Sequence, residues 1–205
     1  MRRMMLLRSH VLPMALFIAG PVAATPPPTD QIAADCDAPT YASDMLVCAE
    51  PGLLALDRRM RDEWAGVDVA GRISPRAWVE AQALWFKRRS LCAFVEMHAD
   101  CLKAAYAERI AVLEALRSTA SRPSHQGTQA ICRDAPWGHM TVRLNSSAAG
   151  TLTIDDRDAR VMAVAMPLSV GADWRPYVGF TVEGKTIRIV PMGAATFVCN
   201  TGTAN

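Results

Sequence analysis

Six cysteines constrain this chain of 205 residues more than any other feature. They lie at Cys36, Cys48, Cys92, Cys101, Cys132 and Cys199. An even number of cysteines in a chain that leaves the cytoplasm indicates a framework of three disulfides. Six cysteines can pair in about fifteen ways, so their number alone leaves the connectivity open.

The first 24 residues are typical of a secretory signal peptide. A basic stretch, "MRRMMLLRSH", precedes the apolar "VLPMALFIAG" and the small residues "PVAA". We expect cleavage after Ala24, with Val22 and Ala24 at the small-residue positions. A retained anchor is the weaker alternative because the apolar run is too short to span a bilayer. No cysteine sits at the expected cleavage site, so we expect no lipid attachment. The sequence thus predicts a periplasmic or secreted protein without a membrane anchor.

Removal of the signal also changes the charge of the chain. Of the 22 basic residues, Arg2, Arg3 and Arg8 are lost, which leaves 19 against 20 acidic residues and a net charge of −1. A nucleic-acid partner, which would require a basic surface, is therefore not expected.

The hydrophobic pattern divides the mature chain into two blocks. Residues 25–35 form a proline-rich leader, and residues 36–117 have helical periodicity, with Pro51 in the first turn of one helix and Ser74-Pro75 opening another. Residues 118–129 are small and polar, which indicates a linker. We expect the first block to be a helical domain.

Residues 130–205 alternate apolar with polar side chains and contain turn signals at Asp155–Asp158 and at Glu183-Gly184-Lys185. Cys132 and Cys199 bracket the block, and we expect them to pair, because a core of about 70 residues is marginal without a crosslink. The predicted fold class is α+β: a disulfide-stapled N-terminal helical domain followed by a small antiparallel β-barrel-like domain.

The segment "QALWFKRRSLC" carries Gln82, Trp85, Arg89 and Cys92 at intervals of three, four and three. At 100° per residue these four positions fall within about 80° of one helix face. We expect Trp85 to pack inward and Arg89 to pair with Asp57, since a buried arginine without a partner is costly. If Cys48 and Cys92 lie at adjoining ends of antiparallel helices, they pair, which leaves Cys36 to pair with Cys101.

These residues resemble the N-terminal domain of the LprI-type lysozyme inhibitors over residues 36–116. The resemblance is carried by the first four cysteines and by Leu56, Asp57, Met60, Trp64, Gln82, Trp85, Arg89, Leu102, Tyr106, Arg109 and Ile110. Trp64 departs from the tyrosine more usual in the family. The resemblance implies an exported helical module that protects against lysozyme. Asp57, Trp64, Gln82, Trp85, Arg89 and Tyr106 are expected to have structural roles in it.

The β block is similar, more weakly, to MliC, the membrane-bound family of inhibitors of C-type lysozyme. "SVGADW" (Ser169 to Trp174) and "FTVEGK" (Phe180 to Lys185) occupy the places of that family's inhibitory loops. The resemblance suggests Ser169, Trp174 and Lys185 as partner-binding residues. A glycosidase cleft holds two carboxyl groups, which a hydroxyl and a cation would satisfy. Val170 and Glu183 depart from the family pattern, and Glu183 would repel the carboxylates.

Other chemistries have less support. Cys92, His98 and Cys101 could bind a metal, but disulfides are expected in an oxidising compartment, and the acidic run at Asp155–Asp158 lacks the remaining ligands of a calcium loop. No motif for a catalytic serine or cysteine occurs. We therefore predict a non-enzymatic protein without cofactor or metal that occludes a lysozyme cleft. The alternatives are an envelope scaffold that does not inhibit lysozyme and an unrecognised hydrolase.

Overall fold

The computed structural model describes residues 31–67, 73–119, 127–147, 150–169 and 171–202. The expected signal peptide (1–24), most of the leader and most of the linker lie outside these residues. Four α-helices and one short 3-10 helix form the first part: α1 (Ala42–Ala49), α2 (Pro51–Ala65), α3 (Gln82–Ser90), η1 (Leu91–Phe94) and α4 (His98–Thr119). Their core contains Leu53, Met60, Trp85, Phe86, Leu102, Tyr106 and Leu113. Pro51 begins α2, as expected from its missing N–H.

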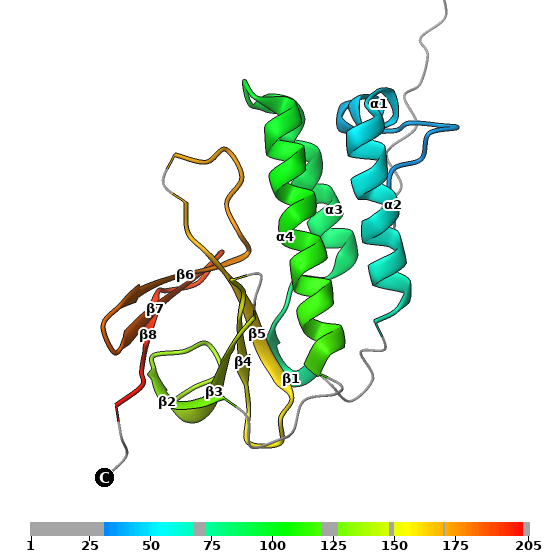
Figure 1. Cartoon of the computed structure of the whole chain (residues 1–205). Helices are drawn as coiled ribbons and strands as arrows, with labels where there is room; N and C mark the ends of the chain where they lie inside the picture. The colour runs from blue at the N-terminus through cyan, green and yellow to red at the C-terminus, as the bar shows by residue number, and fades with distance from the viewer. Residues whose placement is uncertain (1–30, 68–72, 120–126, 148–149, 170, 203–205) are drawn as a thin grey trace, which may run out of the picture.

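Seven strands form a closed β-barrel in the second part, so the predicted α+β class is confirmed. They are β2 (Thr128–Arg133), β3 (Met140–Ser146), β4 (Leu152–Asp155), β5 (Val161–Pro167), β6 (Val178–Glu183), β7 (Thr186–Pro191) and β8 (Phe197–Asn200). The strand order is β5-β4-β3-β2-β8-β7-β6, and a parallel pairing of β5 with β6 closes the barrel. Figure 1 shows the barrel beside the helices.

The predicted turns are present in the barrel. Glu183 pairs with Thr186 across the β6–β7 hairpin, and Gly184 adopts a positive φ of 62° in the tight turn. The acidic run begins at the last residue of β4, and one carboxylate oxygen of Asp156 accepts hydrogen bonds from the backbone N–H groups of Asp158 and Arg160. The run thus forms a turn, in keeping with the expectation.

The prediction that a helix begins at Ser74-Pro75 is wrong. Residues Ile73–Trp78 form the strand β1, which pairs in parallel with β5. Pro75 cannot donate a backbone hydrogen bond, but an edge strand such as β1 tolerates this. One edge of β5 is shared: Val161 and Ala163 pair with β1, and Met166 and Pro167 pair with β6. The free part of this edge, which lies far away in the sequence, determines the strand.

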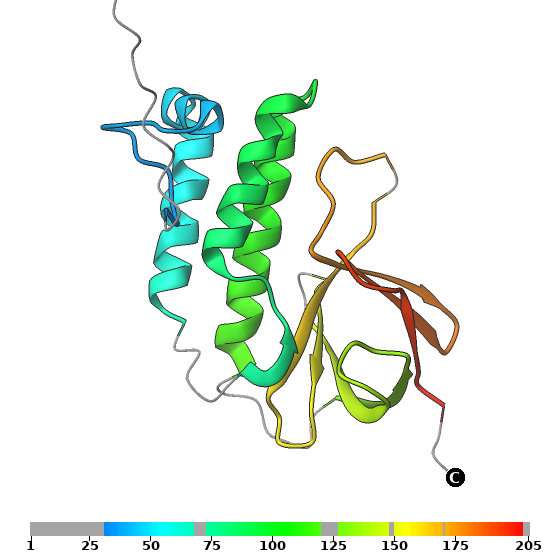
Figure 2. The ribbon, with the colours of Figure 1, turned by 180° about the vertical axis from the view of Figure 1, so that it is seen from behind.

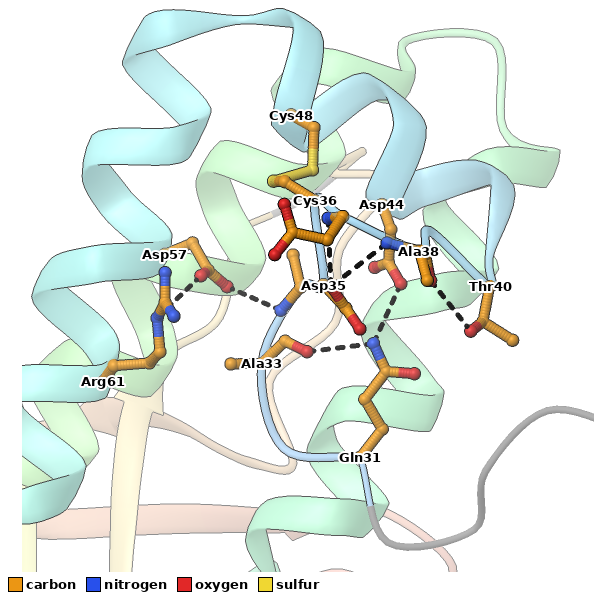
Figure 3. The surroundings of a disulfide bond; sticks show 12 residues. Gln31, Ala33, Asp35, Cys36, Ala38, Thr40, Asp44, Cys48, Asp57 and Arg61 are labelled. Carbon is orange, nitrogen blue, oxygen red and sulfur yellow. Dashed lines mark hydrogen bonds and ion pairs between the residues drawn. A yellow bond between two sulfur atoms is a disulfide. The ribbon is translucent and has the colours of Figure 1, made fainter.

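The disulfides follow a different connectivity from that expected in the helical part. Cys36 pairs with Cys48 and Cys92 pairs with Cys101, which corrects the predicted pairs Cys36–Cys101 and Cys48–Cys92. The prediction considered only helix ends. In the structure, both disulfides join cysteines that are close in sequence, 12 residues apart for Cys36–Cys48 and 9 for Cys92–Cys101. Figure 3 shows the chain before α1 turning back so that Cys36 meets Cys48. The pairing of Cys132 with Cys199, between the adjacent strands β2 and β8, is confirmed.

The helices pack directly against the barrel. Val112, Ala115 and Leu116 of α4 form one apolar cluster with Val161 and Val164 of β5. Figures 1 and 2 show α4 between the barrel and the other helices. The two parts therefore share a continuous apolar contact and the strand β1.

Candidate functional site

The residues that resemble the LprI-type signature form one buried network. Arg89, fully buried, makes an ion pair with Asp44 of α1 and donates a hydrogen bond to the Tyr106 hydroxyl (3.0 Å). Tyr106 in turn donates to Asp57 (2.9 Å). Burial raises the pKa of Tyr106, so its proton stays available for this bond. The expected Arg89–Asp57 pair is therefore wrong: Asp44 is the ionic partner, and Tyr106 links Arg89 to Asp57.

The same network attaches the segment before Cys36 to the helices, as Figure 3 shows. Asp57 accepts a hydrogen bond from the backbone N–H of Ala34 (3.1 Å) and pairs with Arg61 (3.1 Å). The Gln31 side-chain amide donates to Asp44 (3.1 Å). Each buried carboxylate thus contacts both a cation and the N-terminal segment, which compensates part of the cost of its burial.

Gln82 and Trp85 complete the inward face of α3. Gln82 donates to the carbonyl of Ile32 (2.8 Å) and accepts from the guanidinium of Arg109 (2.6 Å). Trp85 is fully buried and packs edge-on against Tyr106, with 5.5 Å between ring centroids. The Arg109 guanidinium also lies 5.7 Å from the ring centroid of half-buried Trp64. These contacts hold the helices together and leave little of the signature exposed to a partner.

Trp174 does not lie at a free surface, contrary to its expected role. Its ring is 7% exposed, and its indole N–H donates to Glu108 of α4 (2.6 Å). The guanidinium of Arg88 stacks 4.0 Å from the centre of the same ring. The aromatic residue of the supposed inhibitory loop therefore anchors that loop to the helices.

Charged groups surround this anchor. Arg88 forms two hydrogen bonds with Glu80 (2.8 and 2.6 Å) and one with Glu108 (3.1 Å). Glu108 also accepts from the backbone N–H of Tyr177 (2.7 Å). Burial raises the pKa of Glu108, while Arg88 and the hydrogen-bond donors oppose this shift. We call Glu80, Arg88, Glu108 and Trp174 the seam cluster.

Ser169 and Lys185 are both exposed, but they belong to different segments. Ser169 lies between β5 and β6, and Lys185 lies in the turn between β6 and β7. In Figure 1 the β5–β6 loop rises beside the helices, whereas the β6–β7 turn projects away from them. The structure therefore does not bring Ser169, Trp174 and Lys185 together into one binding tip.

The outer face of α3 and η1 carries an exposed stripe that sequence reasoning missed. Leu84, Leu91 and Phe94 are 56%, 58% and 85% exposed, and exposed Lys87 lies between the first two in sequence. These four positions have the same intervals of three, four and three as the inward face, displaced by two residues, a signal that was available in the sequence. Figure 2 shows α3 on the outer side of α4. We call these four residues the α3 outer face.

The Cys92–Cys101 disulfide closes the segment that follows this face. His98 Nδ1 lies 3.1 Å from the carbonyl oxygen of Cys92, within the same closed segment. Both cysteines are oxidised and are thus unavailable as metal ligands. Among the described residues, no three His, Cys, Asp or Glu side chains gather as a metal site.

None of the helices in the described part of the chain has the length and apolarity of a membrane span. Comparisons of the chain with protein-family models, with curated proteins and with solved structures find no match. The resemblance to lysozyme inhibitors therefore stays a prediction.

Proposed function

We propose that this protein is an exported, non-catalytic binding protein of the bacterial envelope that inhibits a lysozyme by occluding its cleft. Two observations support the proposal besides the resemblance over residues 36–116. Three disulfides are typical of an oxidising compartment outside the cytoplasm. The signature helix, whose inward face is engaged in the core, presents the apolar α3 outer face to solvent.

The α3 outer face is the observation that carries the proposal. Lys87 makes no side-chain hydrogen bond or ion pair with any residue that the structure describes, and apolar Leu84 and Leu91 lie on the same face. A lysozyme cleft holds two carboxyl groups. An ammonium group carried by a rigid apolar surface could pair with a carboxylate there while the neighbouring side chains exclude water. Phe94, at 85% exposure, is the largest apolar group available as an anchor.

The experiment measures turnover of C-type, goose-type and invertebrate-type lysozymes with micromolar mature protein. Inhibition of at least one class is expected. Lys87→Glu and Phe94→Asp should each weaken inhibition by at least about tenfold, because each removes one central contact. Val182→Asp is the matched control, since Val182 is a 58% exposed apolar residue on β6, outside the α3 outer face.

Three undisturbed lysozyme classes would contradict the proposal. Inhibition that Val182→Asp weakens as much as Phe94→Asp would place the binding face elsewhere. All variants should retain the parental melting temperature, because the altered side chains are exposed.

The alternative is an envelope scaffold that binds another protein without inhibiting lysozyme. The arrangement of the barrel favours it in one respect: Glu183 is exposed at the β6–β7 turn, where a carboxylate would repel a glycosidase cleft. Capture of a single envelope protein by the mature chain, together with unchanged turnover of all three lysozymes, would establish this alternative. Substrate turnover in a broad hydrolase screen would instead indicate an enzyme.

A further inference from the structure

A groove of about 700 Å³ crosses one side of the barrel, away from the α3 outer face and the seam cluster. Its walls come from β2, β3, the turn between β4 and β5, and the residues that follow β8. The volume is in the range of sites that bind small molecules. None of the residues singled out by the sequence as binding residues lines it.

Two arginines give the groove its charge. Arg143 of β3 and Arg157 of the β4–β5 turn both line it. Neither side chain forms an ion pair or hydrogen bond with any residue in the described ranges, and Arg143 Nε is enclosed by protein. Nε itself is closed off from the groove, but the Arg143 side chain lines the groove and has no counter-ion among the described residues, so an anionic group of a ligand would supply one. The guanidinium geometry suits a carboxylate in particular.

The nearby carboxylates are already engaged. Asp155, opposite Arg143 on β4, accepts a hydrogen bond from the Asn145 side chain (2.8 Å). Asp156 lines the groove, but its Oδ1 accepts two backbone N–H groups of its own turn at 2.9 Å each. Both carboxylates therefore already accept hydrogen bonds from groups other than the two arginines. Arg143 and Arg157 are the cations that line the groove.

The remaining lining combines hydroxyl groups with apolar surface. Thr128, Thr141 and Thr201 contribute hydroxyls, and Ile131 contributes apolar surface beside buried Val142. Sugar rings present the same mixture, with hydroxyl groups at their edges and apolar C–H groups on their faces. A lone inorganic anion would fill only a small part of 700 Å³.

From this combination we infer that the barrel groove binds an acidic oligosaccharide, whose carboxylate pairs with Arg143 and Arg157. The inference is independent of lysozyme inhibition, because the groove and the α3 outer face share no residue. It gives the barrel a ligand-binding role that neither of the two resemblances implies. The binding should weaken as salt is added, since ion pairs with partly exposed groups are screened.

The test is calorimetric titration of the full mature chain with trigalacturonic acid. The matched probes are neutral maltotriose, inorganic phosphate and the acidic peptide triglutamate. Binding of trigalacturonic acid is expected, at least about tenfold tighter than that of each other probe. Arg143→Gln and Arg157→Gln should each weaken it by about tenfold, as expected for loss of a charge-assisted hydrogen bond. Arg188→Gln, an exposed arginine of β7 outside the groove, should leave it unchanged.

Each other outcome overturns the inference. Absence of binding, or equal binding of maltotriose, would exclude an acidic saccharide site. Equal binding of phosphate would indicate a simple anion site, and tighter binding of triglutamate would indicate a peptide site. An equal loss in Arg188→Gln would show that overall charge, and not the groove, holds the ligand. Melting curves identical to that of the parent verify that the variants are folded.

Discussion

Replacement of Asp44 by alanine tests whether the inward face of α3 is structural. Asp44 and Arg89 are both fully buried and form an ion pair. Asp44→Ala leaves the guanidinium of Arg89 with the Tyr106 hydroxyl as its remaining hydrogen-bond partner among the described residues. Removal of one member of a buried pair costs about 3–5 kcal/mol. For a chain of this size, about 2–4 °C per kcal/mol gives a melting temperature lower by roughly 6–20 °C.

The loss is measured by urea unfolding of the mature protein, followed by tryptophan fluorescence, with the free energy extrapolated to water. Arg59→Ala is the control, because its ion pair with Glu114 is 58% and 34% exposed on the two sides and should contribute at most about 1 kcal/mol. Asp44→Asn keeps one acceptor oxygen and should give an intermediate loss. An Asp44→Ala loss no greater than that of Arg59→Ala would refute the argument.

A double substitution separates the charge from the packing. Asp44→Leu combined with Arg89→Met removes both charges and should be less destabilising than Asp44→Leu alone, because no uncompensated buried charge remains. A double variant that loses the sum of both single losses would show that the two side chains are not energetically coupled, and would contradict the role given to the stranded charge.

Two further predictions concern the disulfides and the pH dependence. No lysine or arginine lies between Cys36 and Cys48 or between Cys92 and Cys101, so non-reducing tryptic digestion should release two separate, internally closed peptides. A single crosslinked pair of these peptides in the mass spectrum would contradict the structure. Burial raises the pKa of Glu108 above its ordinary 4.5, so its contribution to stability is fully present below pH 4.5 and is lost as the pH rises through the folded-state pKa. Relative to Glu108→Gln, the parental melting temperature should therefore fall over that window in scanning fluorimetry, and parallel curves would exclude the effect.

The periodicity of the sequence predicted most of the elements because it reports local burial. Pro51 begins α2, and the turn at Gly184 joins two alternating strands, as expected from local backbone chemistry. The pair Cys132–Cys199 was also predictable because the two cysteines bracket one block. Ser74-Pro75 was not predictable, because the same dipeptide suits a helix start and an edge strand, and the free edge of β5 decides between them.

The candidate site could be predicted only in part. The inward direction of Trp85 and Arg89 follows from helical spacing, but the choice of Asp44 over Asp57 depends on where α1 packs. Trp174 was expected to bind a partner. The sequence could not show that its loop folds back onto α4, where the indole N–H donates to Glu108. The groove with Arg143 and Arg157 could not be predicted either, because its lining residues come from segments that are distant in sequence and meet only in the folded barrel.

The sequence by itself determined the helical and β blocks, the inward face of α3 and the need for crosslinks, because these depend on residues close together in the chain. Only the tertiary structure decided which cysteines of the helical part pair, which carboxylate meets Arg89, and which surfaces stay exposed. Those outcomes depend on contacts between distant segments, whose geometry is set by the packing of α4 against β5 and by the shared edge of that strand.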